Sequence, residues 1–159
     1  MKTKARAIPE GFHAVTPCLT LRDSREAIEF YKKAFGAKEL EVFPSPDGKG
    51  TMHAAIRIGD SVVMMGDERP GCGKSAETLG ESPINLFLYV PNVDAVFKQA
   101  VAAGGEVIMP VADMFWGDRA GTLKDPFGYG WTIATHTRDL SNKEIREGAE
   151  SFFATAAKA

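Results

Sequence analysis

The stretch of the chain with the densest chemical potential is residues 114–119, of sequence MFWGDR. It brings two aromatic side chains and a potential ion pair together just before a predicted strand. Aromatic and arginine side chains are frequent anchors of small-molecule and protein contacts, and the guanidinium of Arg119 suits a carboxylate or phosphate. The alternative is a structural turn, in which Trp116 covers the sheet edge and Asp118 pairs with Arg119 or caps a backbone amide.

His53 is the histidine with the clearest catalytic potential. It alternates with apolar residues in a predicted strand over residues 52–58. If its face of the strand lines a cavity, His53 could serve as acid, base or ligand; the alternative is a hydrogen-bonded histidine of the sheet. His13 and His136 lie at the ends of predicted strands, where we expect solvated side chains.

The loop over residues 66–82 contains GCGKS at 71–75, which looks like the end of a phosphate-binding loop. That motif needs a glycine where this chain has Glu68, and a long helix after the Lys-Ser pair. Gly80 and Pro83 follow too soon for such a helix. We therefore expect a flexible connector or lid in this loop, and no nucleotide site.

The elements that must position these residues form an internal repeat. Thr16 corresponds to Asn85 at an offset of 69 residues, and Met64 corresponds to Thr132 at an offset of 68. A near-constant offset indicates duplication of one supersecondary unit. Each half reads as strand, helix, strand, strand, strand.

Helices are predicted by apolar periodicity and by capping residues. The apolar residues over 24–35 recur on one helical face, with Asp23 as the N-cap and Gly36 as the stop. A second helix is predicted over 93–103 in the same way. A third, over 141–157, begins with a capping box and carries an apolar stripe, which we expect to pack on the body of the protein or on a partner subunit.

Strands account for the other elements. Gly59-Asp60 is a two-residue hairpin signal, and residues 125–128 (DPFG) make a longer turn in which the aspartate can cap the backbone. The predicted strands are residues 15–21, 38–42, 52–58, 61–65, 84–90, 106–109, 122–124 and 131–135.

Composition limits the class of partner. The 159-residue chain has a formal net charge of −2 and a pI of about 5.9, so no broad basic field is available for nucleic acid. It has no apolar run long enough to span a membrane and no signal-peptide core at the N-terminus. The two cysteines do not indicate a disulfide framework. We expect a cytoplasmic protein that binds neither nucleic acid nor membrane.

Three segments carry a family resemblance: residues 27–37 (AIEFYKKAFGA), 57–60 (RIGD) and 125–131 (DPFGYGW). With them the chain resembles the vicinal oxygen chelate superfamily, which includes glyoxalase I, bleomycin- and fosfomycin-resistance proteins and extradiol dioxygenases. Residues 64–68 (MMGDE) and 115–119 (FWGDR) look more narrowly like its PhnB-like branch. The resemblance implies an α+β fold of two βαβββ modules that form a curved, cup-like mixed sheet.

The resemblance also implies where metal-dependent members bind their divalent ion. Those positions correspond here to Thr16, Met64, Asn85 and Thr132. Hydroxyl, thioether and amide groups are weak ligands for ions such as zinc, so we expect no metal site and no cofactor. The superfamily's Lewis-acid chemistry is therefore not expected at these positions.

The sequence thus predicts one glyoxalase-like domain: module 1 at about 13–68, a linker at 69–82, module 2 at about 83–137, and a C-terminal helix at about 141–157. We expect a homodimer. The expected pocket for a small organic ligand is lined by Thr16, His53, Met64, Asn85, Trp116, Arg119 and Thr132.

Three functions stay open. The first is a metal-independent binder that sequesters a small organic ligand. The second is an enzyme of the same superfamily, lyase- or dioxygenase-like, that uses His53 or an unusual metal set. The third is a structural or protein-interaction homologue with a closed cup. Neither the ligand nor the occurrence of any reaction follows from the sequence.

Overall fold

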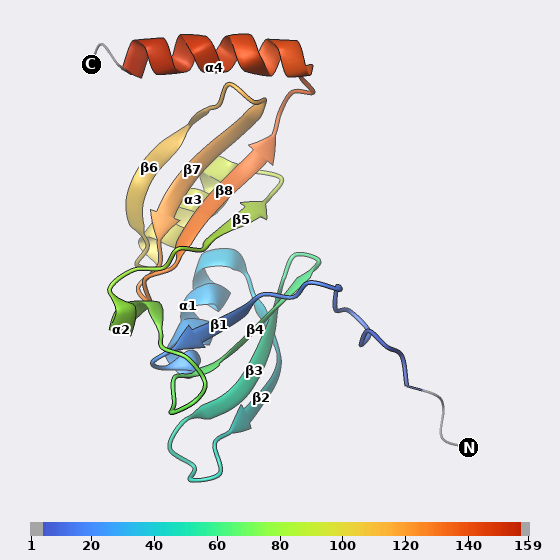
Figure 1. Cartoon of the computed structure of the whole chain (residues 1–159), viewed down its shortest axis with the longest axis vertical. Coiled ribbons are helices and arrows are strands. Elements are labelled where there is room, and N and C mark those ends of the chain that lie inside the picture. The colour runs from blue at the N-terminus through green and yellow to red at the C-terminus, as the bar shows by residue number, and fades with distance from the viewer. Residues whose placement is uncertain (1–4, 157–159) are drawn as a thin grey trace. The chain divides into compact units, whose positions relative to one another are not determined.

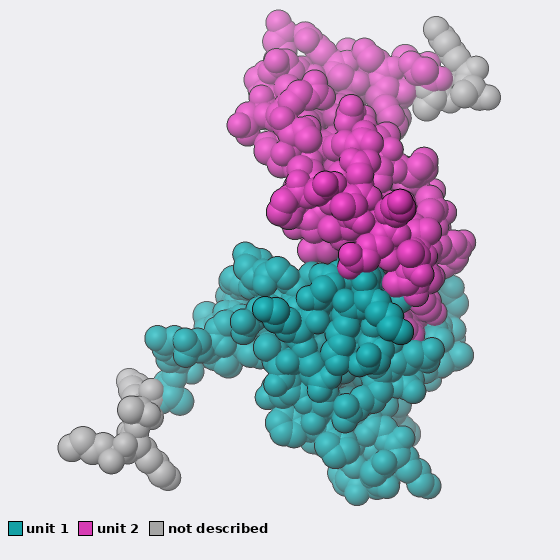
Figure 2. Space-filling model, turned by 180° about the vertical axis from the view of Figure 1, so that it is seen from behind, with its two compact units in different colours: residues 1–83 teal, residues 84–159 magenta. Residues whose placement is uncertain are grey.

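The computed structural model describes residues 5–156, and the chain divides into two compact units, 1–83 and 84–159 (Figures 1 and 2). Both units have the predicted order of strand, helix, strand, strand, strand. The architecture is α+β, with a mixed four-stranded sheet in each unit and an additional C-terminal helix. Closure of the two sheets into a shared cup stays a prediction.

Unit 1 contains a sheet in the order β1-β4-β3-β2. Strand β1 runs parallel to β4, and the other neighbours are antiparallel. Its elements are β1 (Cys18–Leu21), α1 (Ser24–Phe35), β2 (Lys38–Pro44), β3 (Thr51–Ile58), β4 (Ser61–Asp67) and α2 (Ala76–Leu79).

Unit 2 repeats that topology in the order β5-β8-β7-β6, again with one parallel pair, β5 and β8. The remaining pairs are antiparallel. Its elements are β5 (Asn85–Tyr89), α3 (Val93–Ala102), β6 (Glu106–Asp113), β7 (Asp118–Lys124), β8 (Gly130–His136) and α4 (Asn142–Ala156).

The predicted capping interactions explain where the two main helices begin. Asp23 accepts a hydrogen bond from the Glu26 amide at 3.0 Å, and Asn92 accepts one from the Ala95 amide at 3.1 Å. Each bond satisfies an amide that the first helical turn leaves unpaired. Gly36 ends α1 at φ 66°, in the left-handed region that glycine adopts without strain.

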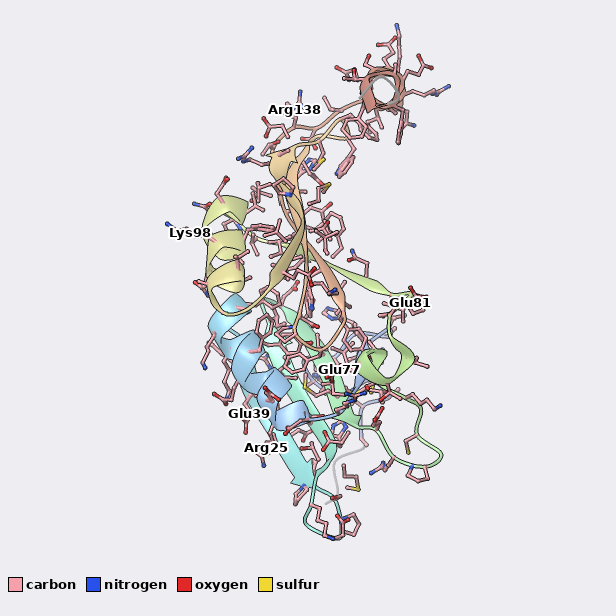
Figure 3. The ribbon with its side chains drawn as sticks, turned by 90° about the vertical axis from the view of Figure 1, so that its left-hand side faces the viewer. Arg25, Glu39, Glu77, Glu81, Lys98 and Arg138 are labelled. Atoms are coloured by element: carbon pink, nitrogen blue, oxygen red, sulfur yellow. The ribbon has the colours of Figure 1, made fainter. Side chains whose placement is uncertain are left out.

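Each main helix covers one face of its own sheet, as Figure 3 shows from the side. Helix α1 packs against β3 and β4, and α3 packs against β6, β7 and β8. Apolar side chains fill both interfaces, and Lys98 of α3 points away from its sheet. Because successive strand residues point to opposite faces, each sheet also has a second face, here called its open face.

The DPFG turn behaves as predicted. Asp125 is buried, and its carboxylate accepts the backbone amides of Phe127 and Tyr129 at 2.9 Å each. It also accepts the indole N–H of Trp131 at 2.9 Å. One carboxylate therefore fixes the hairpin that leads into β8.

Several element boundaries differ from the sequence prediction, and one helix was not predicted; strand β6, for example, ends at Asp113 rather than at residue 109. Strand β1 begins at Cys18 rather than at residue 15, because Pro17 has no amide hydrogen and the Thr16 hydroxyl bonds locally to the His13 carbonyl at 3.0 Å. Strand β7 begins at Asp118, four residues before its predicted start at residue 122. The expected flexible connector contains helix α2, capped by the buried Ser75.

Helix α4 begins with the predicted capping box, in which Ser141 and Glu144 exchange hydrogen bonds. Its apolar stripe meets the body of unit 2 at Phe115, whose ring lies 5.6 Å from that of Phe152 and 6.2 Å from that of Phe153. Both of these helix phenylalanines nevertheless remain exposed.

Candidate functional site

The open face of unit 2 carries a line of neutral polar side chains across three strands. Asn85 on β5 donates from Nδ2 to the Thr132 hydroxyl on β8 at 2.9 Å. The Thr132 hydroxyl also pairs with that of Thr122 on β7 at 2.9 Å. The structure thus brings together Asn85 and Thr132, two of the predicted site residues.

Two exposed aromatic residues continue this face along β5. Phe87 and Tyr89 alternate with Asn85, so all three project from the same side of the strand. Their rings lie 5.0 Å apart, with 49% of Phe87 and 61% of Tyr89 exposed. Exposed aromatic groups beside hydrogen-bonding side chains form a surface suited to a small organic molecule.

A buried carboxylate, Asp118, lies at the start of β7 on the same face and collects three side-chain donors. It is 2% exposed and accepts hydrogen bonds from the Trp116 indole at 2.8 Å, the Tyr89 hydroxyl at 3.0 Å and Nδ1 of His136 at 2.7 Å. We call these four residues the Asp118 cluster. It ties the end of β5, the loop before β7 and the end of β8 to one carboxylate.

The charges within this cluster reinforce one another. Burial raises the pKa of the Asp118 carboxyl, but hydrogen bonds from His136, Trp116 and Tyr89 outweigh that effect and hold the pKa below its usual range. Hydrogen bonds to Asp118 and then to Asp139 raise the pKa of His136. The carboxylate and the imidazolium therefore stabilise each other's charged forms.

Arg119 follows Asp118 directly and therefore points to the opposite face of β7, toward α3. Its guanidinium bonds both oxygens of Asp94, at 2.8 and 2.9 Å, and Asp113 at 3.2 Å. These carboxylates, Asp94 first, raise the pKa of Arg119. The suggested Asp118–Arg119 pair is not what forms, and contact of Arg119 with a ligand stays a prediction.

Unit 1 holds the other predicted site residues. Thr16 and Met64 line one hollow of about 390 Å³, together with the chain segment 7–14. Thr16 precedes β1 rather than lying within it, whereas Met64 lies on β4 opposite Cys18.

His53 projects from the open face of the unit 1 sheet, because its neighbour Ala54 is fully buried on the α1 side. Its Nε2 lies 3.3 Å from a carboxylate oxygen of Glu41 on β2, and its ring stacks on Phe43 with centroids 6.1 Å apart. This geometry fits the hydrogen-bonded sheet histidine, and it also gives the imidazole a carboxylate that can orient it.

The side chains at the expected metal positions do not fit a divalent ion. Thr16, Met64, Asn85 and Thr132 supply only hydroxyl, thioether and amide groups, and the last two bond to each other. Within the described chain, no cluster of three or more histidine, cysteine, aspartate or glutamate side chains is placed to hold a metal.

Several residues on the open face of unit 2 were not among the site residues predicted from the sequence. Phe87 and Tyr89 could have been found, since they share the strand alternation of Asn85. The expectation of a solvated His136 was incomplete: its side chain is 51% exposed, but both ring nitrogens bond carboxylates, with Nε2 3.0 Å from Asp139. Nothing in the sequence pattern indicates that His136 reaches Asp118.

Comparison with known proteins establishes the family. The model of the Glyoxalase/Bleomycin resistance protein/Dioxygenase superfamily matches residues 12–133. The chain belongs to this superfamily. It is also 42% identical over 142 residues to Mb0911c, an uncharacterised protein of Mycobacterium bovis, with 87% of this chain and 93% of that protein covered.

Solved structures of superfamily proteins share the fold. The PhnB protein of Bacillus cereus matches with a TM-score of 0.60 at 18% identity, over 77% of this chain and 99% of that one. The fosfomycin resistance protein FosX of Listeria monocytogenes matches with a TM-score of 0.59 at 14% identity, over 85% and 97%. That FosX structure is of a mutant form and holds Mn(II) and a dihydroxypropylphosphonic acid.

Proposed function

We propose that this glyoxalase-superfamily protein binds a small organic molecule on the open face of unit 2, without a metal held by the protein. The observation that carries the proposal is the hydrogen bond between Asn85 and Thr132 beside the exposed ring of Phe87. Neutral hydrogen-bonding groups next to an aromatic surface favour an uncharged or weakly polar ligand over a cation.

Each part of the surface has a role in this proposal. The rings of Phe87 and Tyr89 stack against the apolar part of the ligand, while Asn85 and Thr132 bond its polar group. Asp118 holds the Tyr89 ring in place by accepting a hydrogen bond from its phenolic hydroxyl. Such preorganisation lowers the entropic cost of binding because the ring is held in place before the ligand arrives. Contact of the ligand with Trp116 belongs to the same proposal, whereas ligand contact at Thr16 and Met64 in unit 1 stays a separate prediction.

Retention of the ligand distinguishes sequestration from catalysis. The full-length protein is incubated with a metabolite library, separated from free compounds, denatured, and its released contents identified by mass spectrometry. Sequestration predicts a chemically unchanged compound at no more than one equivalent per chain, with reduced retention by Asn85→Ala. A converted product in the free fraction, at many equivalents per chain, would contradict it.

The second candidate is an enzyme that uses His53 as acid or base. The observation that favours it is the Glu41 carboxylate 3.3 Å from His53 Nε2. A carboxylate beside an imidazole can fix the orientation of the ring. Multiple turnover that is lost in His53→Ala and retained in His13→Ala would establish this function.

We further propose a homodimer and a cytoplasmic location. The exposed Phe152 and Phe153 of α4 support an association between subunits, and the free thiols of Cys18 and Cys72 suit a reducing compartment. Among residues 5–156, no helix has the length and apolar character needed to cross a bilayer. Light scattering after size exclusion tests the dimer, and cell fractionation tests the location.

A further inference from the structure

Three loops of unit 1 meet at one end of its sheet and enclose a cavity. The first loop follows β1, the second joins β2 to β3, and the third follows β4. One space of about 480 Å³ and an adjoining one of about 290 Å³ share the lining residues Arg22, Lys49, Gly50, Thr51 and Asp67. We call them together the loop cavity. Its size falls within the range of small-molecule sites.

The carboxylates of the loop cavity are already engaged by donors from the protein. Asp67 accepts the backbone amides of Ser24 and Thr51, both at 2.7 Å. Asp47 accepts the Ser45 hydroxyl at 2.6 Å and the Lys49 amide at 3.1 Å, both on the same oxygen. These bonds explain how loops with little regular structure can hold a fixed shape.

Glu68 is engaged in the same way. It accepts the Ser75 amide at 2.7 Å and the Thr78 hydroxyl at 2.8 Å. The Ser75 amide, followed by the Thr78 hydroxyl, holds the pKa of Glu68 below its usual range, and the charge of Arg22 adds to that effect. The carboxylates therefore serve to order the loops.

The positively charged side chains of the loop cavity form few hydrogen bonds and ion pairs. Among the described residues, Lys49 and Arg25 form no ion pair within 4.0 Å. Arg22 donates from Nε to the Thr78 hydroxyl at 3.2 Å and lies 3.9 Å from the Glu77 carboxylate. Arg69 donates from Nε to the sulfur of Cys72 at 3.0 Å. Four positive side chains thus line one cavity with their main donor capacity still available.

The close approach of two of these loops depends on a residue without a side chain. A Cβ atom on Gly50 would lie 2.8 Å from Oδ2 of Asp67, too near for the present contact. Gly50 therefore lets the tip of the β2–β3 loop, with Lys49, lie against the end of β4. The cavity is built by specific contacts and is not merely a gap between mobile loops.

We propose that the loop cavity binds a small, multiply charged oxyanion, either phosphate-bearing or a polycarboxylate, through Arg22, Lys49 and Arg69. Guanidinium and ammonium groups bind such oxygens by charge-assisted hydrogen bonds. Both oxygens of Asp67 and one oxygen of Asp47 already accept hydrogen bonds from the loops, so the donors left for an incoming anion are the cationic side chains. This site is built by unit 1 alone and shares no residue with the proposed ligand surface of unit 2.

Calorimetric titration of the full chain with pyrophosphate and, separately, with citrate tests the proposal, with sulfate at matched ionic strength as reference. We expect saturable binding of one of the two probes with about one site per chain. The identity of that probe distinguishes a phosphate source from a carboxylate source. The absence of saturable binding by both probes at millimolar concentration would overturn the proposal.

Variants then locate the site. Lys49→Gln and Arg69→Gln should each weaken binding about tenfold, because each removes a charge-assisted hydrogen bond. Asp47→Asn should strengthen it about threefold, because the charge is lost while the accepting oxygen is kept. Lys98→Gln, on α3 of unit 2, is the control and should change nothing. Equal affinity in all four variants, with unchanged melting temperatures, would show binding elsewhere and contradict the proposal.

Discussion

Nδ2 of Asn85 lies 2.9 Å from the hydroxyl oxygen of Thr132, so a hydrogen bond joins these two side chains across β5 and β8. Their positions correspond to two metal-ligand positions implied by the family resemblance. A hydrogen bond between neutral groups in their place removes the negative charge that would hold a cation. It leaves a polar, uncharged patch beside exposed aromatic rings.

Replacing Thr132 by valine should reduce both stability and ligand affinity. The side chain is nearly buried, and its hydroxyl has partners in Asn85 and Thr122, which valine cannot bond. We expect a loss of about 1–2 kcal/mol in the free energy of unfolding, measured by urea denaturation. A variant as stable as the wild type, with unaltered ligand affinity, would contradict the role given to this pair.

Asp118→Asn should be far more damaging than a matched change on the surface. An amide at this buried position places N–H groups against donors from Trp116, Tyr89 or His136. We expect a loss of about 3 kcal/mol in the free energy of unfolding. Asp113→Asn, an exposed partner of Arg119, should cost less than about 1 kcal/mol. Similar losses in the two variants would show that the Asp118 cluster contributes little.

The Asp118–His136 pair predicts a defined dependence of stability on pH. The raised pKa of His136 gives stability that is complete below the unfolded value of about 6.5 and is lost as pH rises through the folded pKa. The lowered pKa of Asp118 gives stability that is present above about 3.9 and is lost in acid. The contribution of the pair should therefore be greatest between these two values.

The measurement compares the melting temperatures of the wild type and of His136→Gln between about pH 4 and pH 9. The difference between them should be largest near pH 5 to 6 and should shrink toward pH 9. His13→Gln is the control, and its melting temperature should change with pH as that of the wild type does. A difference that grows with rising pH would mean that the pair is not charged as described.

Arg119→Met separates a structural role for this arginine from ligand contact. Its bonds to Asp94 and Asp113 place it on the α3 side of the sheet, with about a third of the side chain exposed. We expect only a small loss of stability, measured by urea denaturation, and an unchanged ligand affinity. A fall in affinity without further loss of stability would instead place Arg119 at the ligand.

Helix α1 shows what the sequence could predict. Its bounds, Ser24–Phe35, match the prediction because a local capping residue, a one-sided apolar pattern and Gly36 all agree. The DPFG turn was predictable for the same reason, since Asp125 bonds amides only two and four residues away. Hydrogen bonds between residues this close along the chain can be predicted from the sequence alone.

The Asp118 cluster shows what could not be predicted. Along the chain, the donor Tyr89 lies 29 residues before Asp118, Trp116 lies two residues before it, and His136 lies 18 residues after it. Adjacent strand residues point to opposite faces, which excludes the Asp118–Arg119 pair, but that rule applies only once Asp118 is known to lie within β7. Helix α2 was missed because Glu68, from outside the helix, orders its first turn.

The most direct test of the central claim is calorimetric titration of chelator-treated full-length protein with divalent metals and with each compound retained from the library. We expect an organic ligand to bind saturably without added metal, and Thr132→Val to bind it more weakly. Tight binding of nickel, zinc or iron, with ligand binding only after the metal is restored, would contradict the central claim.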